Sequence, residues 1–255
     1  MIKTHALALA LLAALSLMPA ARAQDALREN ARRVADEKGS AIVTVRAVVS
    51  LTQSYEGSQA PPREVTNEFT ATVIDKDGTT LIPLSSIDPG PLTAMMDPEF
   101  QIDARVQDLK IIVNKRTEIA ASVVRRDPDL DLALIRPTTP PEDPLTFIDI
   151  RDNAEAQLLE QVFVLTRFDS IADFEVGAMT GEIQAVVKRP RTYYVPSSNL
   201  IEAEDGTPVF NAEGRLIGFI AVRVAPATGN SSGDMIYTVL PAADAIDLLD
   251  MDPED

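Results

Sequence analysis

The chain has 255 residues, of which 23 are lysine or arginine and 39 are aspartate or glutamate, so its formal net charge is −16 at pH 7. Hydrophobic residues make up 45% and charged residues 24%, a balance typical of globular proteins rather than disordered ones. The acidic surplus argues against nucleic acid and anionic membranes as partners, because both need a cationic surface. The chain contains no cysteine, which excludes disulfides and thiolate chemistry, and its only histidine is His5.

Residues 1–23 have the pattern of a secretory signal peptide. Lys3 supplies the positive charge, an apolar run follows, and Ala21-Arg22-Ala23 is a cleavage site of the A-x-A type. The apolar run is too short for the ~20 residues of a membrane-spanning helix. We therefore expect export to the periplasm or out of the cell, no membrane span, and a mature chain without histidine.

After this segment, residues 24–38 mix apolar residues with charges and predict a short amphipathic helix that ends at Gly39. Short β-branched and apolar runs then alternate with turn residues, which predicts an all-β sandwich or barrel. We expect a loop over 53–67 and a hairpin closed by Asp75-Lys76-Asp77-Gly78. The expected strands are residues 41–51, 69–74, 79–84, 110–113, 119–124, 132–136, 162–167, 181–187, 192–195, 216–224 and 235–239.

A proline-rich stretch over 137–144 divides these strands into two sets. It predicts a linker between a first barrel at about 39–136 and a second barrel at about 145–250. A second helix is expected over 242–249, and an acidic tail over 251–255. The predicted fold class is all-β, with short helices near both ends of the folded region.

Two segments of the first predicted barrel resemble motifs of trypsin-like proteases of the HtrA/DegP type. The run from Val73 to Gly78, followed by Leu81-Ile82-Pro83-Leu84-Ser85, is similar to the hairpin and strand that deliver the catalytic histidine in that family. Ser85 stands at the position of the histidine. The run from Arg126 to Ile135 is similar to the segment around the catalytic aspartate, which corresponds here to Asp131.

A third segment, Glu202 to Phe210 with the strand after it, resembles the nucleophile loop of the same family. Alignment on Gly206 and Pro208 puts Asp205 where the nucleophilic serine belongs. The resemblance covers about residues 41–249 and implies a trypsin-like double β-barrel with a degenerate triad of Ser85, Asp131 and Asp205. Residues 229–233, which look like a second nucleophile loop, follow the wrong strand and are interpreted as a turn.

The substitutions remove the chemistry of a Ser-His-Asp site. The triad aspartate orients an imidazole, so without one we interpret Asp131 as a hydrogen-bond acceptor for a turn at the start of a buried strand. Acyl transfer also needs donors aimed at a developing oxyanion, whereas this loop carries Glu202, Glu204 and Asp205.

Other chemistries stay open. A Ser-Lys dyad would join Ser85 or Ser86 to a lysine that approaches in space, and the candidates are Lys76, Lys110, Lys115 and Lys188. Asp131, Glu204 and Asp205 could bind a hard cation, although no calcium-loop spacing is present and solvated acids are the plainer interpretation. No cofactor or metal is expected, since the ligands and phosphate loops they need are missing.

We therefore expect an inactive peptidase homologue that binds a protein or peptide in the former substrate cleft. The acidic surface favours a basic partner. The candidate contact is the loop of Ala203, Glu204, Asp205 and Gly206. The alternatives are a serine hydrolase or endopeptidase with a non-standard site, and a structural component of an envelope complex. No sequence feature establishes an oligomeric state.

Overall fold

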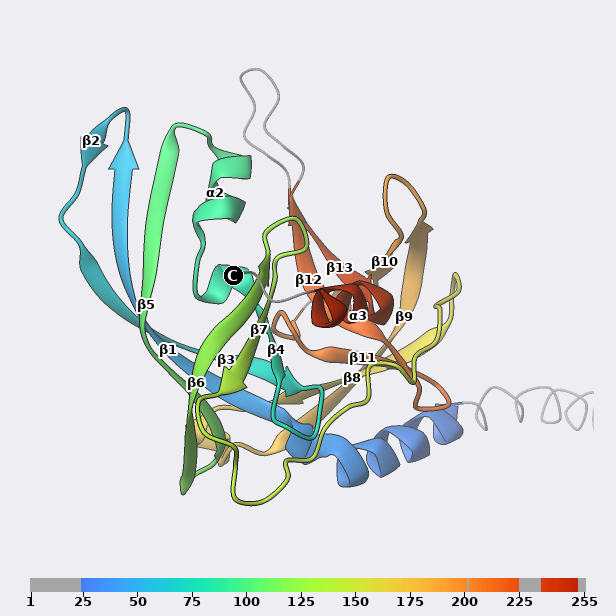
Figure 1. Ribbon diagram of the computed structural model, residues 1–255. Coiled ribbons are helices and arrows are strands. Elements are labelled where there is room, and N and C mark those ends of the chain that lie inside the picture. Colours follow the sequence, from blue (N-terminus) through green and yellow to red (C-terminus); the bar gives the residue numbers. More distant parts are fainter. Residues whose placement is uncertain (1–23, 201, 225–234, 252–255) are drawn as a thin grey trace, which may run out of the picture.

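The computed structural model describes residues 24–200, 202–224 and 235–251. The predicted signal peptide, the turn at 229–233 and residues 252–255 of the predicted tail lie outside the described residues. The described chain forms two β-barrels, one from its first half and one from its second (Figure 1).

The first barrel consists of antiparallel strands in the order β1-β3-β4-β7-β6-β5, and pairing between β1 and β5 closes it. A short strand, β2 (Ser58–Gln59), pairs with the end of β1 outside the barrel. The barrel strands are β1 (Ile42–Tyr55), β3 (Arg63–Val73), β4 (Thr80–Pro83), β5 (Phe100–Asn114), β6 (Thr117–Asp127) and β7 (Leu132–Pro137).

The second barrel is closed in the order β10-β13-β12-β11-β8-β9. Residues 138–160 connect the barrels without a named strand or helix, so the connection is longer than the stretch expected at 137–144. The predicted all-β double barrel is confirmed. The strands are β8 (Gln161–Arg167), β9 (Val176–Val187), β10 (Tyr193–Pro196), β11 (Pro208–Asn211), β12 (Leu216–Val224) and β13 (Met235–Pro241).

The two barrels share a hydrophobic core. One cluster of buried side chains includes Leu134 of the first barrel, Phe163 and Phe219 of the second, and Leu27 of the N-terminal helix. Phe163 stacks on Phe210 with 5.2 Å between the ring centroids. Burial of these side chains against one another holds the barrels in a fixed relation, which positions the residues between them.

The N-terminal helix, residues 24–38, packs on the turn between β11 and β12. Its buried face presents Leu27 and Val34, and the Asn30 amide nitrogen donates to the Ala212 carbonyl at 2.8 Å. Gly214 in that turn has a φ of 84°, and a Cβ there would lie 2.8 Å from Val34. This position therefore requires glycine.

Two further helices complete the fold. Helix α3 (Ala242–Asp250) occupies the place predicted at 242–249. Helix α2 (Gly90–Met96) was not expected, because seven residues are too few to show a helical period. None of the described helices is long and apolar enough to cross a membrane.

The loop expected over 53–67 is wrong. Strand β1 continues to Tyr55, and β3 begins at Arg63, with a turn at Glu56 and Gly57, both of which have positive φ. Strand β5 likewise begins at Phe100, ten residues before the predicted start. These strand ends extend beyond the buried core and carry polar, exposed side chains, so their sequence resembles that of a loop.

Candidate functional site

Ser85 and Asp131 lie at the ends of two paired strands. Strand β4 leads into a 3₁₀ turn, Leu84–Ser86, and Asp131 directly precedes β7, which pairs with β4 through Pro83 and Leu132. The Ser85 backbone N–H donates to Asp131 Oδ1 and the Ser85 hydroxyl donates to Oδ2, both at 2.7 Å. One residue thus supplies donors to both carboxylate oxygens.

The backbone around Asp131 is strained and buried. Its φ is 55°, in the left-handed region, and the residue is 7% exposed. Burial raises the pKa of its carboxyl group, while the hydrogen bonds from Ser85 oppose that rise. The Leu84 N–H also donates to the Asp131 carbonyl at 3.0 Å. Asp131 therefore accepts hydrogen bonds from the 3₁₀ turn that follows β4.

Asp205 lies across the gap between the barrels, in the turn before β11. Its Oδ1 is buried and has no hydrogen-bond partner within the described residues. Burial, together with the negative charges of Asp131 and Glu204, raises the pKa of Asp205 to about 7. The folded protein therefore favours the protonated form of this carboxyl group more than an exposed aspartate would.

The turn that carries Asp205 is tied to the first barrel. Glu204 Oε2 accepts the backbone N–H of Thr70 at 2.7 Å, and the Thr72 hydroxyl donates to the Gly206 carbonyl at 3.0 Å. Gly206 has a φ of 82°, which favours glycine. The structure therefore brings Ser85, Asp131 and the turn at 204–206 together between the barrels.

Backbone amides in this turn have partners inside the protein. The Ala203 N–H donates to the Leu200 carbonyl at 3.1 Å, and the Gly206 N–H donates to the Ile220 carbonyl at 2.8 Å. Ala203, two residues before Asp205, is buried. Its N–H is therefore turned into the loop.

Of the four lysines considered as partners of Ser85 or Ser86, three are paired elsewhere, and Lys188 lines a different hollow, on the second barrel. Lys76 lies beside Asp77, Lys115 pairs with Asp173, and Lys110 pairs with Asp108 and Glu118. In residues 24–200, 202–224 and 235–251, no group of three or more acidic, histidine or cysteine side chains is placed to hold a metal ion.

One hollow is lined by the turn at 204–206, and another is lined by Asp131. The first, the acidic hollow, has a volume of about 350 Å³. Its lining is Phe69, Ser86, Glu202, Ala203, Glu204, Asp205 and Tyr237. Three of the four residues proposed from sequence for binding thus line it, while the fourth, Gly206, is buried beneath Pro83.

The second hollow, the apolar groove, has a volume of about 480 Å³ and lies between α2 and the end of β12. It was not predicted, because the sequence gives no sign that α2 would lie beside β12 (Figure 1). It is lined by Leu92, Met95, Pro128, Asp129, Asp131, Pro190, Arg191, Val222, Arg223 and Val224.

The end of β12 has an open backbone edge in this groove. Ile220 exchanges hydrogen bonds with Gly206 and Thr207, so its polar groups point away from β13. The direction of the N–H and C=O groups alternates from one residue of a strand to the next. The N–H and C=O groups of Val222 and Val224 therefore point in the same direction as those of Ile220, away from β13. Strand β11 pairs only as far as Phe219, and no backbone partner for these groups lies within the described residues.

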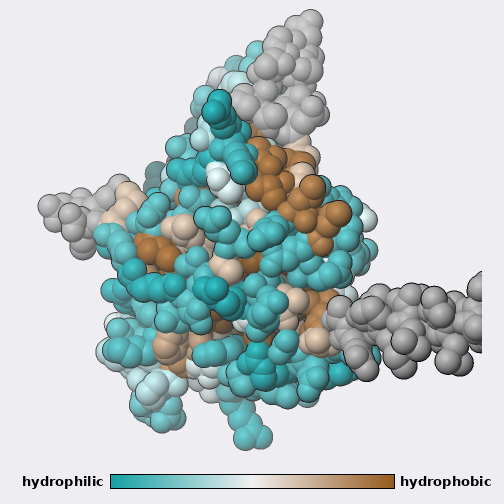
Figure 2. All heavy atoms as spheres, turned by 90° about the vertical axis from the view of Figure 1, so that its right-hand side faces the viewer, coloured by the Kyte–Doolittle hydropathy of each residue, from teal (hydrophilic) through white to brown (hydrophobic). Residues whose placement is uncertain are grey.

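Exposed hydrophobic side chains accompany this edge. Met235 and Ile236, which pair with Val224 and Arg223, are 53% and 44% exposed. Figure 2 shows hydrophobic side chains gathered in the upper part of the face that it presents. Contiguous exposed apolar surface of this kind is typical of protein-binding sites.

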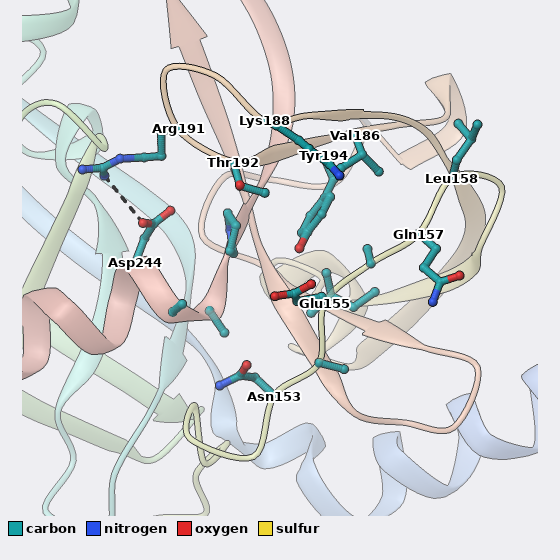
Figure 3. Close-up of a pocket in the computed structure, with 16 residues that line it drawn as sticks. Asn153, Glu155, Gln157, Leu158, Val186, Lys188, Arg191, Thr192, Tyr194 and Asp244 are labelled. Carbon is teal, nitrogen blue, oxygen red and sulfur yellow. Dashed lines mark ion pairs between the residues drawn. The ribbon is translucent and has the colours of Figure 1, made fainter.

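A third hollow of about 740 Å³ lies on the second barrel and was not predicted (Figure 3). Glu155 and the hydroxyl group of Tyr194 point into it, and burial raises the pKa of Tyr194. At one rim Arg191 pairs with Asp244 at 3.7 Å. Arg191 also lines the apolar groove, so it stands between the two hollows.

We compared the chain with known proteins. No curated protein matches the chain by sequence. The protease domain of MamO from Magnetospirillum magneticum, in its apo form, has a similar structure, with 19% identity and a TM-score of 0.50 over 79% of this chain and 94% of that chain. This likeness concerns the fold. The family model described as the trypsin-like peptidase domain matches residues 34–219, and the chain therefore belongs to that family.

Proposed function

We propose that this protein is an exported trypsin-like pseudoprotease that binds an extended protein segment between its barrels. The observation that carries the proposal is the pairing of Ser85 with both oxygens of Asp131, each at 2.7 Å. In a triad the aspartate accepts a hydrogen bond from an imidazole. Residues 24–255 contain no histidine, so no imidazole is available to take up the proton of a nucleophile.

The turn at 203–206 argues in the same direction. Stabilisation of an oxyanion needs backbone donors at the nucleophile position and two residues before it. Here the Ala203 N–H already donates to the Leu200 carbonyl, and Asp205 replaces the nucleophile. The carboxyl groups of Glu204 and Asp205 would further oppose a developing negative charge.

The open edge of β12 supports a binding role. Among the residues that the structure describes, the outward backbone groups of Val222 and Val224 have no partner, so an added strand can pair with them, and this kind of contact needs no catalytic side chain. The acidic hollow and the net charge of −16 favour a segment with basic residues.

Activity is tested with the purified secreted protein, an unfolded protein substrate and a covalent serine-reactive probe. We expect neither hydrolysis nor labelling. Labelling that disappears in Ser85→Ala or Ser86→Ala would overturn the proposal. The double variant Ser85→His with Asp205→Ser tests the assignment of the two positions, and detectable proteolysis by it would support that assignment.

Binding is tested by Val224→Pro, which removes one N–H from the open edge and leaves the ladder with β13 intact. We expect this variant to keep its stability and to lose affinity for extended peptides about tenfold or more. Arg151→Ala, far along the chain from the cleft, serves as the matched surface control. Export is tested by N-terminal sequencing of the secreted form, which we expect to begin at Gln24.

A further inference from the structure

The third hollow lies at one end of the second barrel. Strands β9 and β13 end there and β10 and β12 begin there, as their pairing shows. From these strand ends the lining takes Val186, Tyr194, Ile217 and Pro241, and residues 153–158 and the start of α3 border the opening. Its volume of about 740 Å³ lies within the range of ~300–1,000 Å³ that is typical of small-molecule sites, which often occupy the mouths of β-barrels.

The most deeply buried residues that line this hollow are apolar or aromatic. They are Ala156, Tyr194, Ile217 and Ala242. Leu158, which also lines the hollow, is exposed and adds apolar surface at its rim. An aliphatic side chain of a ligand would leave water on entering this hollow, and that transfer favours binding.

The charged residues of the lining come from different segments. Lys188 and Arg191 belong to the connection between β9 and β10, whereas Glu155 belongs to the connection between the barrels and Asp244 to α3. Arg191 and Asp244 pair at 3.7 Å, but within the described residues neither Lys188 nor Glu155 forms an ion pair. In the view of Figure 3, Lys188 and Glu155 stand on opposite sides of Tyr194. Their two opposite charges are therefore available to a ligand that carries both.

Neutral polar side chains add groups that a peptide unit can use. Gln157 contributes an amide group to the lining, and Thr192 contributes a hydroxyl group. Each of these groups can both donate and accept a hydrogen bond, as the N–H and C=O groups of a peptide bond require. The lining thus combines apolar surface, both charges and amide-binding groups.

We propose that the third hollow binds a short peptide, of about two residues, with both of its ends free. Lys188 pairs with the terminal carboxylate and Glu155 with the terminal ammonium group, while an aliphatic side chain packs against Ile217 and its apolar neighbours. This inference goes beyond the proposed function, since none of these contacts involves the open edge at Val222 and Val224.

The experiment measures binding to the secreted protein by isothermal titration calorimetry. The ligands are the dipeptide leucyl-leucine, its N-acetylated form, its C-terminal amide, and free leucine. We expect leucyl-leucine to bind at least about tenfold tighter than each of the other three, because each of them lacks one terminal charge or the peptide bond. Absence of binding by leucyl-leucine, or equal binding by a capped form or by free leucine, would overturn the inference.

Two protein variants assign the charges. Lys188→Met should abolish the preference for leucyl-leucine over its amide and keep the preference over the acetylated form, and Glu155→Gln should do the reverse. Lys76→Met and Glu142→Gln, which make the same changes outside this hollow, serve as matched controls. Both Lys188 and Glu155 are exposed, so their replacement leaves the core unchanged. A dipeptide whose binding responds to neither variant would lie elsewhere on the protein and refute this site, and the proposed function of the cleft would still stand.

Discussion

Replacing Asp205 with asparagine should make the stability of this protein less dependent on pH. The carboxyl group has a pKa of about 7 in the folded protein against an ordinary value of 3.8, because it is buried beside Asp131 and Glu204. The folded state therefore holds the proton more tightly than the unfolded state. The stability that this group contributes is complete below pH 3.8 and is lost as the pH rises from there to about 7.

The magnitude follows from linkage. Between the two pKa values the free energy of unfolding falls by ~1.4 kcal/mol per pH unit. From about pH 5.5 to about pH 8.5 the full shift would cost ~2 kcal/mol, and we expect about 1–2 kcal/mol after allowance for screening by solvent. Asp205→Asn removes the carboxyl group whose deprotonation lowers stability. The variant should therefore raise the free energy of unfolding more at the higher pH than at the lower.

The assay is urea denaturation of the unmodified protein and of Asp205→Asn at both pH values. The difference in free energy of unfolding between the two proteins is then compared at the lower and the higher pH. Glu202→Gln, which removes an exposed carboxylate from the same loop, controls for the loss of one negative charge. An Asp205→Asn variant whose effect on stability is equal at both pH values would refute the reasoning, because the buried carboxyl would then not be the titrating group.

Three further variants test how the site is supported. Ser85→Ala should lower the free energy of unfolding by about 1–3 kcal/mol, since Asp131 Oδ2 loses its donor, and urea denaturation with Ser86→Ala as control measures this. Arg167→Met should lower the free energy of unfolding by about 2–3 kcal/mol, because the guanidinium group of Arg167, in the second barrel, donates to the carbonyls of Ile42 and Val113 in the first. An unchanged urea denaturation midpoint would contradict this contact between the barrels. Gly214→Ala should lower the free energy of unfolding by about 1–3 kcal/mol, because Gly214 has a positive φ and an added Cβ would contact Val34. Thermal unfolding of this variant should have a lower midpoint than that of Gly57→Ala, since no atom lies near the position of an added Cβ at Gly57.

Much of the fold could be predicted from local pattern. The short apolar runs predicted eleven strands because a buried strand leaves alternating or continuous apolar residues in the sequence. The predictions failed where strands leave the core, as in residues 53–67, and for β11, a four-residue strand that begins with Pro208 and therefore does not have the sequence of a central strand. Helix α2 was missed because seven residues are too few to show a helical period.

The candidate site was also predicted only in part. Motif resemblance was enough to single out Ser85, Asp131 and Asp205, and the structure brings these positions together between the barrels. The apolar groove was beyond sequence reasoning, because its walls come from α2 and β12, which are more than a hundred residues apart in the chain and meet only when the barrels pack.

The sequence by itself determined that residues 24–255 contain neither histidine nor cysteine, since composition does not depend on conformation. It also determined that acidic residues dominate the loop at 202–205. Only the tertiary structure decided that Ser85 supplies both donors to Asp131, that Glu204 reaches Thr70 in the other barrel, and that one carboxyl oxygen of Asp205 is buried. Hydrogen bonding and burial depend on distances between residues remote in sequence, and the packing of the two barrels sets those distances.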